Sequence, residues 1–280
     1  MDGKPSQTKD RHLISEHKNR KLDIPVRLHQ STIKTNRNVQ PTKLIMKEPS
    51  NLAAPPGFIG FDEQKPLRIY HRHLPHWRQN GVSYAVTFRL GDSLPQSKLE
   101  ELKRHRQRWE KTNPEPRDKS QWQKFAKEVT LMTEGWVDEG YGACYFRTRK
   151  NATLVADALR FYENTKCSVP CFTVMPNHIH AIMCPREGFE LEAVLKTIKG
   201  WISRQINLRM KAPSVRSNTR SSVSLWAQES YDRIIRDEEH LYRVVQYIGR
   251  NGSAAGLDTN EYLRWISQSW KDTGWGFRDF

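Results

Sequence analysis

Alternating apolar and polar residues predict the strands of this chain. In residues 82–90 every second position is apolar or aromatic and β-branched residues are frequent, which is typical of a half-buried strand. Two apolar runs, 169–175 and 178–184, are separated only by Pro176-Asn177, so we expect a strand pair joined by a tight corner. A shorter strand is expected at 143–146.

Helical periodicity alternates with these strands. Apolar residues recur three and four positions apart in several segments, and charged residues fill the remaining positions. Asp237 is the expected N-cap of the last such segment. Because strands and helices mingle without a regular strand–helix–strand rhythm, the pattern predicts an α+β fold with an antiparallel sheet. The predicted helices span residues 96–111, 121–134, 151–163, 190–209 and 238–250.

Both ends of the chain depart from this pattern. Residues 1–60 contain one aromatic residue, Phe58, and too little apolar surface to offset the entropy of ordering, so they are predicted to be a disordered basic arm. The folded domain is expected over residues 66–260. A tail at 261–280 carries three tryptophans that we expect to pack onto the domain: Trp265, Trp270 and Trp275.

Charge narrows the range of functions. The chain has 46 lysines and arginines against 31 acidic residues, a net charge of +15, and such an excess favours a polyanionic partner such as nucleic acid. The segment 209–224 is basic without any acidic residue, so we expect a flexible basic loop there. The sequence lacks a long apolar run and an apolar signal core, which indicates a cytoplasmic protein with reduced cysteines and no membrane contact.

A pair of histidines is the sharpest chemical feature. His178 and His180 flank Ile179 in a predicted strand, so both imidazoles project from one face while Ile179 faces the core. Such a pair can grip one divalent ion, and with oxygen or amide ligands it suits Mg²⁺ or Mn²⁺ at an open catalytic site. The alternative is a pair of half-exposed histidines on a solvated sheet face.

Three of the tyrosines that follow the histidines are candidate nucleophiles for a nuclease: Tyr231, Tyr242 and Tyr247. Tyr247 lies on the flank of the buried stripe of the last predicted helix, and Asn251 projects beside it one turn later. Tyr242 with Gln246 has the same spacing and is a genuine rival, so Tyr247 ranks only slightly higher. Tyr231 precedes the helix and is expected to be structural.

Several blocks of this sequence, taken together, resemble one known family. They are similar to the signature blocks of REP-associated tyrosine transposases, domesticated relatives of the insertion-sequence-200-type HUH single-tyrosine transposases. The resemblance covers about residues 66–260. The blocks are Met-Pro-Asn-His-Ile-His at 175–180, Tyr-Asp-Arg-Ile-Ile-Arg-Asp-Glu-Glu-His at 231–240, Tyr-Ile-Gly-Arg-Asn at 247–251 and Ala-Gly-Leu at 255–257, with opening blocks at 75–77, 84–90 and 92–95.

The resemblance implies a ferredoxin-like domain whose central antiparallel sheet is flanked by helices. It implies attack of a tyrosine on a DNA phosphate, which leaves a 5′-phosphotyrosine and a free 3′-OH. Carried over by position, it makes Tyr247 the nucleophile rather than Tyr242, and His178, His180 and Asn251 the ligands of Mg²⁺ or Mn²⁺. One departure is Asn251-Gly252, where the family usually has Asn-Pro, and we expect a looser helix end there.

The expected partner is single-stranded or hairpin DNA, bound by a monomer or a homodimer. Lys196, Lys199 and Arg204 of the 190–209 helix are the candidate phosphate contacts, unless they form only a solvated helix face. A second hypothesis is a cleavage-inactive, sequence-specific DNA-binding relic of a transposase. A metal-dependent hydrolase of small substrates is disfavoured by the charge and by the lack of a dense Asp/Glu/His cluster.

Overall fold

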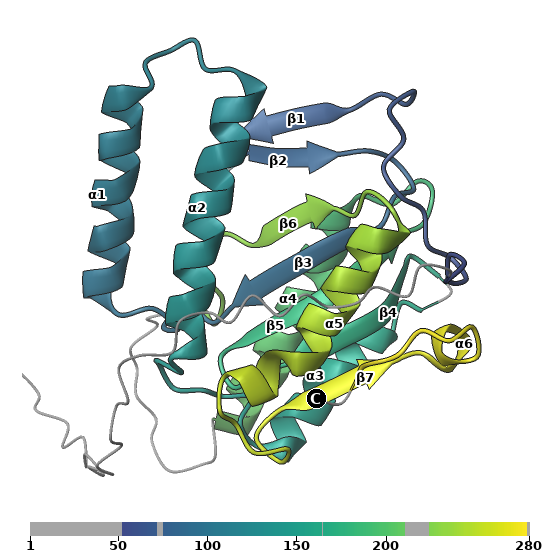
Figure 1. The fold of residues 1–280 in the computed structure, drawn as a ribbon. Helices are drawn as coiled ribbons and strands as arrows, with labels where there is room; N and C mark the ends of the chain where they lie inside the picture. Colours follow the sequence, from purple (N-terminus) through teal and green to yellow (C-terminus); the bar gives the residue numbers. More distant parts are fainter. Residues whose placement is uncertain (1–51, 72–74, 164, 211–223, 279–280) are drawn as a thin grey trace, which may run out of the picture. The chain divides into compact units, whose positions relative to one another are not determined.

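The computed structural model describes residues 52–71, 75–163, 165–210 and 224–278 (Figure 1). The chain divides into two units, Met1–Met46 and Lys47–Phe280, and the first lies outside the described residues. Most of the arm predicted over 1–60, and residues 211–223 of the loop predicted over 209–224, also lie outside them.

A five-stranded antiparallel sheet in the order β6-β3-β5-β4-β7 forms the centre of the second unit. The chain order β3-α3-β4-β5-α4-β6 with the spatial order β6-β3-β5-β4 is the ferredoxin-like arrangement, and β7 extends it beside β4. This confirms the predicted α+β class and its ferredoxin-like sheet. The elements are β3 (Tyr84–Arg89), α3 (Arg149–Arg160), β4 (Cys167–Val174), β5 (His178–Pro185), α4 (Leu191–Met210), β6 (Tyr231–Ile234) and β7 (Leu263–Ile266).

The two faces of the sheet carry different helices. α3 and α4 cover one face, and α5 (Glu238–Ala254) covers the other, in front of the sheet in Figure 1. Alternation along β5 explains this division: Ile179 and Ala181 belong to the core cluster with α3 and α4, whereas Ile182 packs with α5. The histidines share the parity of Ile182 and therefore face α5.

Two further helices stand beside the edge of the sheet (Figure 1). α1 (Gln96–Thr112) buries no residue fully, and α2 (Lys119–Asp138) buries a stripe that includes Phe125 and Val129. Asp118 caps α2: its carboxylate accepts a hydrogen bond from the backbone N–H of Gln121, and the side-chain oxygen of Gln121 accepts one from the backbone N–H of Asp118. A short two-stranded sheet, β1 (Arg68–His71) with β2 (Pro75–Arg78), and α6 (Gln268–Lys271) complete the described elements.

Three expectations were wrong in detail. No strand forms at 143–146, because Cys144 has a φ of 48° and the backbone turns there. Residues 52–60 are packed, since the indole of Trp275 donates to the Ala53 carbonyl over 2.9 Å and that of Trp270 to Pro56 over 3.0 Å. The domain boundary predicted at residue 260 was wrong, because β7 (Leu263–Ile266), in the segment predicted as a tail, lies within the main sheet.

The tryptophans do pack onto the domain, as predicted. Trp270 and Trp275 are buried beside α5, and the ring of Trp265 stacks on Phe172 of β4. Short polar strands escaped prediction: β6 has the sequence Tyr-Asp-Arg-Ile, which carries no apolar alternation.

A buried ionic network fixes β2 against β6. Asp232 accepts hydrogen bonds from Arg78 (Nη2 to Oδ2, 3.0 Å) and from His76 (Nδ1 to Oδ2, 2.9 Å). The other nitrogen of His76 lies 3.1 Å from Glu229 Oε1. Burial by itself lowers the pKa of His76, but the hydrogen bonds to Asp232 and Glu229 outweigh it and raise that pKa to about 9. His76 is therefore a cation at neutral pH.

We predict that His76 contributes stability that disappears in alkali. Its pKa is about 9 in the folded chain and 6.5 in the unfolded chain, so the contribution is complete below 6.5 and is lost as pH rises through 9. His76→Gln should cost up to about 3 kcal/mol of unfolding free energy at the acid end of this window and much less above it. Urea unfolding across the window measures this, with His105→Gln as control. A loss of unfolding free energy in His76→Gln that does not change with pH would contradict the cationic state of His76.

Candidate functional site

The histidine pair occupies the middle of the sheet. β5 is paired on both sides, and His180 lies opposite Thr87 of β3 and Thr173 of β4. The side chains are buried, with His178 1% and His180 3% exposed. The prediction that the two imidazoles share one face, with Ile179 in the core, is therefore confirmed, and the alternative of half-exposed histidines is wrong.

Asn177 sets the protonation of His178. The amide nitrogen of Asn177 donates to the carbonyls of Val137 (3.1 Å) and Tyr141 (3.0 Å) at the end of α2. Its oxygen therefore faces Nδ1 of His178 at 2.8 Å, and that nitrogen must carry the proton. The Nε2 atom of His178 is left with a free lone pair, which is the form that ligates a metal.

His180 completes a hydrogen-bonded imidazole pair. Its Nε2 lies 2.9 Å from Nε2 of His178, and the two rings are nearly perpendicular, at 88°. Its Nδ1 lies 2.8 Å from the hydroxyl of Thr87. A hydroxyl donates or accepts, so Thr87 supports both tautomers of His180: one that donates to His178 and one that frees Nε2.

Both imidazoles are neutral. Burial, followed by the neighbouring His180, lowers the pKa of His178 well below its ordinary value. Burial, followed by the positive charge of Arg233, lowers the pKa of His180 to about 3. Neutral imidazoles are the form that coordinates a cation.

Tyr247 and Asn251 of α5 face the pair. The ring of Tyr247 meets that of His180 edge-on, with 5.1 Å between centroids. The side chain of Asn251 hydrogen-bonds to the phenol in the sense that lowers its pKa, so the amide nitrogen donates. The amide oxygen of Asn251 is buried without a hydrogen-bond partner. The structure thus brings together the four residues that the sequence had placed in one site.

Two carboxylates of α2 join them, and sequence reasoning missed both. Glu134 accepts a hydrogen bond from the phenol of Tyr247, and burial raises the pKa of Glu134. Asp138 lies one turn later, with Oδ1 buried, unpartnered and 3.6 Å from Nε2 of His178. Burial, followed by the charge of Glu134, raises the pKa of Asp138 to about 7. Their spacing of four in an amphipathic helix was the available signal.

The donor set fits a divalent cation. Two imidazole lone pairs and the orphaned amide oxygen of Asn251 are the ligand types that the sequence predicted, and the orphaned oxygen of Asp138 lies beside them. No three His, Cys, Asp or Glu side chains form a complete ligand group in the described part of the chain. An ion here would therefore need Asn251 as well as the histidines.

The rival tyrosines are both engaged in other contacts, although Tyr231 lines the same cavity as Tyr247. The ring of Tyr242 packs against Trp275, and Gln246 donates to the carbonyl of Gly276 over 2.9 Å. That pair anchors the C-terminal residues to α5. The hydroxyl of Tyr231 bonds to Thr133 of α2 over 2.8 Å, which agrees with the structural role predicted for it.

The predicted DNA contacts lie away from this site. Lys196, Lys199 and Arg204 belong to α4, on the opposite face of the sheet from the histidines. Lys199 donates to the carbonyl of Ala227 over 3.4 Å and lies over the ring of Trp226. Lys196 and Arg204 are exposed. Their contact with DNA stays a prediction.

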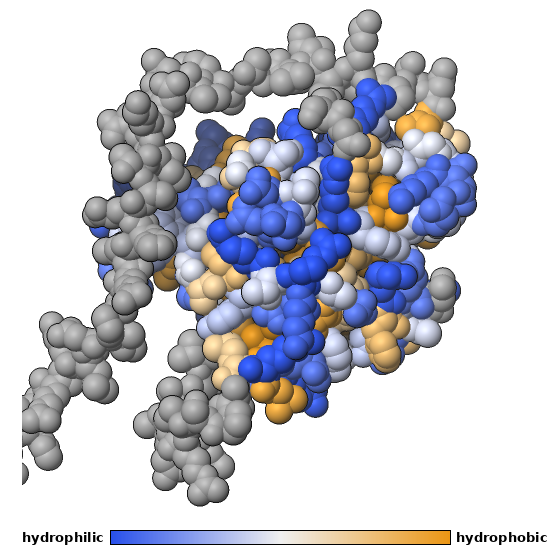
Figure 2. Space-filling model, turned by 90° about the horizontal axis from the view of Figure 1, so that it is seen from below, coloured by the Kyte–Doolittle hydropathy of each residue, from blue (hydrophilic) through white to orange (hydrophobic). Residues whose placement is uncertain are grey.

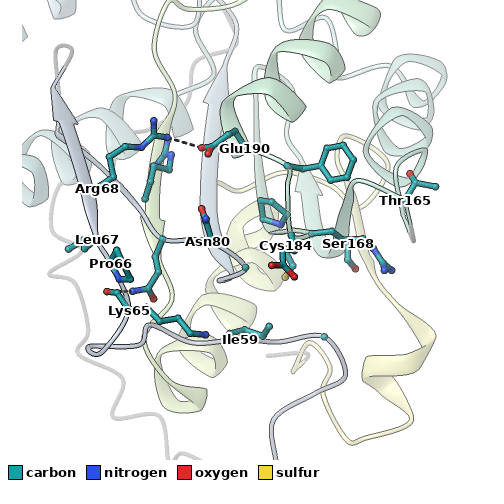
Figure 3. Close-up of a pocket in the computed structure, with 18 residues that line it drawn as sticks. Ile59, Lys65, Pro66, Leu67, Arg68, Asn80, Thr165, Ser168, Cys184 and Glu190 are labelled. Carbon is teal, nitrogen blue, oxygen red and sulfur yellow. Dashed lines mark hydrogen bonds and ion pairs between the residues drawn. The ribbon is translucent and has the colours of Figure 1, made fainter.

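Two of the cavities in the described part of this unit bear on the site. The larger, of about 1190 Å³, is lined by Ile59, Arg68 and Cys184, and Figure 3 shows the Arg68–Glu190 ion pair at its wall. It lies at the far end of β5, roughly 20 Å of strand away from His178. The smaller cavity, of about 630 Å³, is lined by His180, Tyr247 and Glu134. The smaller cavity is therefore the one that adjoins the candidate site.

The visible surface of this unit is mainly hydrophilic. Among the described residues on the face shown in Figure 2, hydrophilic side chains predominate and apolar ones form separate small areas. No described helix has the length and apolar character needed to cross a membrane.

Comparison with known proteins supports the motif resemblance. Residues 147–251 match a family model described as "Transposase IS200 like", and the match spans both histidines, Tyr247 and Asn251. The resemblance to this family is thereby confirmed for that segment. No curated protein matches the chain. A solved structure, "Structure of the REP associates tyrosine transposase bound to a REP hairpin", is 13% identical, with 68% of this chain and 74% of that chain covered and a TM-score of 0.32.

The end of α5 is not loosened by Gly252. The helix continues to Ala254, and the ring of Tyr262 packs so closely that a Cβ on Gly252 would lie 2.5 Å from it. Proline, which the family usually has here, would need the space that this ring fills. The expected looser helix end is therefore wrong for this chain.

We predict that Gly252→Ala lowers the unfolding free energy by about 1–3 kcal/mol, because the added methyl must displace the Tyr262 ring. Gly200→Ala on α4 is the matched control: its Cβ would meet nothing within 4 Å, so alanine should stabilise by up to about 1 kcal/mol. Urea unfolding of both variants tests this. Equal effects of the two changes would show that the Tyr262 contact is unimportant.

Proposed function

We propose that this protein cleaves and rejoins single-stranded DNA at hairpin-flanked sites through a covalent bond between Tyr247 and a 5′-phosphate. The observation that carries the proposal is the convergence of Tyr247 and Asn251 from α5 with His178 and His180 from β5. The match of residues 147–251 to the IS200-like transposases supports it, as does the net charge of +15. Hairpin-flanked sites are what the motif resemblance implies.

The nucleophile needs activation. Burial, followed by the charges of Glu134 and Asp138, raises the pKa of the Tyr247 phenol far above its usual value, so the free protein holds a neutral phenol. Glu134 already accepts its hydrogen bond and is placed to take the proton. Asn251 donates to the phenolic oxygen and would stabilise the charge that develops there.

The reaction then follows from the atoms present. The phenolic oxygen attacks phosphorus as its proton passes to Glu134, the bond between phosphorus and the 3′-oxygen breaks, and the proton returns to that oxygen to give a free 3′-OH. His178, His180 and Asn251 would hold a Mg²⁺ or Mn²⁺ ion, which polarises the phosphate when bound. Because one phosphodiester replaces another, a second 3′-OH can reverse the step and rejoin a strand.

A cleavage-inactive, DNA-binding relic is the second candidate. The burial of Tyr247 favours it, since a phenol whose pKa is so strongly raised is a poor nucleophile in the free protein. The two candidates differ in one product, the covalent protein–DNA adduct.

We predict that Tyr247→Phe abolishes an adduct that resists SDS, because the adduct requires the phenolic oxygen bonded to phosphorus. The assay incubates the protein and Mn²⁺ with labelled single-stranded hairpin DNA from the flanks of its own gene. Tyr242→Phe is the matched control and should keep the adduct, since Tyr242 packs on Trp275. An adduct that survives in Tyr247→Phe would assign the nucleophile elsewhere, and its absence from the wild type would favour the relic.

We predict that His178→Ala or His180→Ala weakens Mn²⁺ binding by more than about tenfold and abolishes cleavage. DNA affinity should largely remain, because phosphate contacts come mainly from lysine and arginine. Titration calorimetry measures the metal affinity without any need for activity, and His105→Ala on α1 is the control. Wild-type Mn²⁺ affinity in both histidine variants would refute the ligand assignment.

A further inference from the structure

The cavity beside Tyr247 is one end of a groove along α2. The α2 residues that line it recur at intervals of three and four, so they form a single face of the helix. They run from Lys119 to Glu134, roughly 22 Å of helix. α5 forms the other wall and β3 and β6 the floor, between α2 and α5 in Figure 1. The α2 residues are Lys119, Gln123, Ala126, Lys127, Thr130, Leu131 and Glu134.

Exposed charge in this groove is mostly positive. Lys119 and Lys127 project from α2, and Arg233 and Arg236 from β6 and the turn after it, all four exposed. The acidic residues of the lining are Asp232, Glu134 and Glu63. Asp232 is neutralised by Arg78 and His76, and Glu134 bonds to Tyr247, which leaves Glu63 as the exposed acid.

Arg233 lies at the catalytic end of the groove. It lines the same cavity as His180 and Tyr247, and it stands opposite Ala85 of β3. Ala85 packs with the α5 cluster, so Arg233 is on the face of the sheet that carries the histidines. Arg233 therefore sits where it can meet a phosphate that approaches Tyr247.

An aromatic surface lines the other end. Trp77 of β2 is half-buried in the lining, and Lys119 lies over its ring, 4.4 Å from the centroid. Aromatic rings interleaved with cations are the means by which proteins hold single strands without reading their sequence.

We propose that this groove binds the single-stranded DNA that flanks the cleaved phosphate, with Arg233, Arg236 and Lys127 on its phosphates and Trp77 beneath a base. The inference rests on the proposed function for its substrate. A cavity of about 630 Å³ suits a ligand of about two nucleotides and is too small for a duplex. The length of the α2 face lets the strand continue toward Lys119.

The test measures binding without cleavage. Fluorescence anisotropy of a labelled oligothymidylate in EDTA gives affinity across a salt series, so it does not depend on Tyr247 chemistry. Lys127→Ala and Arg236→Ala should each weaken binding by about three- to fivefold and flatten the log–log salt slope by about 0.7. Lys127→Arg should restore both. Lys124→Ala is the matched control, because Lys124 is exposed on the same helix but outside the groove, and it should change neither.

The outcomes separate the two proposals. Equal losses in Lys124→Ala and Lys127→Ala would overturn the groove, since the effect would then be one of net charge. Tighter binding of a duplex or of single-stranded RNA of matched length would overturn the DNA single strand as its occupant. If the wild-type protein forms no adduct but Lys127→Ala still weakens binding, the proposed cleavage function is refuted and the DNA-binding groove is supported.

Discussion

The amide of Asn177 is the constraint on which the site depends. It joins the carboxyl end of α2 to the corner between β4 and β5, and its oxygen fixes the proton on His178. The side chain of Asn177 is itself buried, and a buried amide that loses a hydrogen-bond partner costs about 1–3 kcal/mol. Since α2 also carries Glu134 and Asp138, the same contact that orients the imidazole holds both carboxylates beside it.

Local pattern was enough to predict the histidines and not enough to predict their neighbours. The two-residue repeat of a strand was enough to predict that His178 and His180 share a face, once the apolar run 178–184 was recognised as a strand. The choice of Tyr247 over Tyr242 needed the family resemblance. The structure separates them through Trp275, which covers Tyr242 from a segment far along the chain. The periodicity of a helix cannot predict such a contact, because the partner residue lies outside the helix.

The remaining misses share one physical cause. Glu134 and Asp138 read as the polar side of a surface helix, and only the docking of α2 against the sheet turns that side inward. β6 is held largely by a buried ionic network at Asp232, and its sequence lacks the apolar alternation that signals a strand. The prediction of a disordered arm includes residues 52–60 because they follow a long polar segment and contain Pro and Gly, but they are fixed by indole hydrogen bonds from the other end of the chain. In each case tertiary contacts override a local preference.

The placement of α5 puts the four predicted site residues in one chain. Tyr247 meets the histidines of its own chain, and the C-terminal residues hold α5 there through Gln246 and the rings packed on Gly249 and Gly252. In the proposed reaction, a single copy would carry one covalent DNA end at a time through Tyr247. A lone copy would then have to cut and join two ends in succession, and the first end would have to be released before the second is captured.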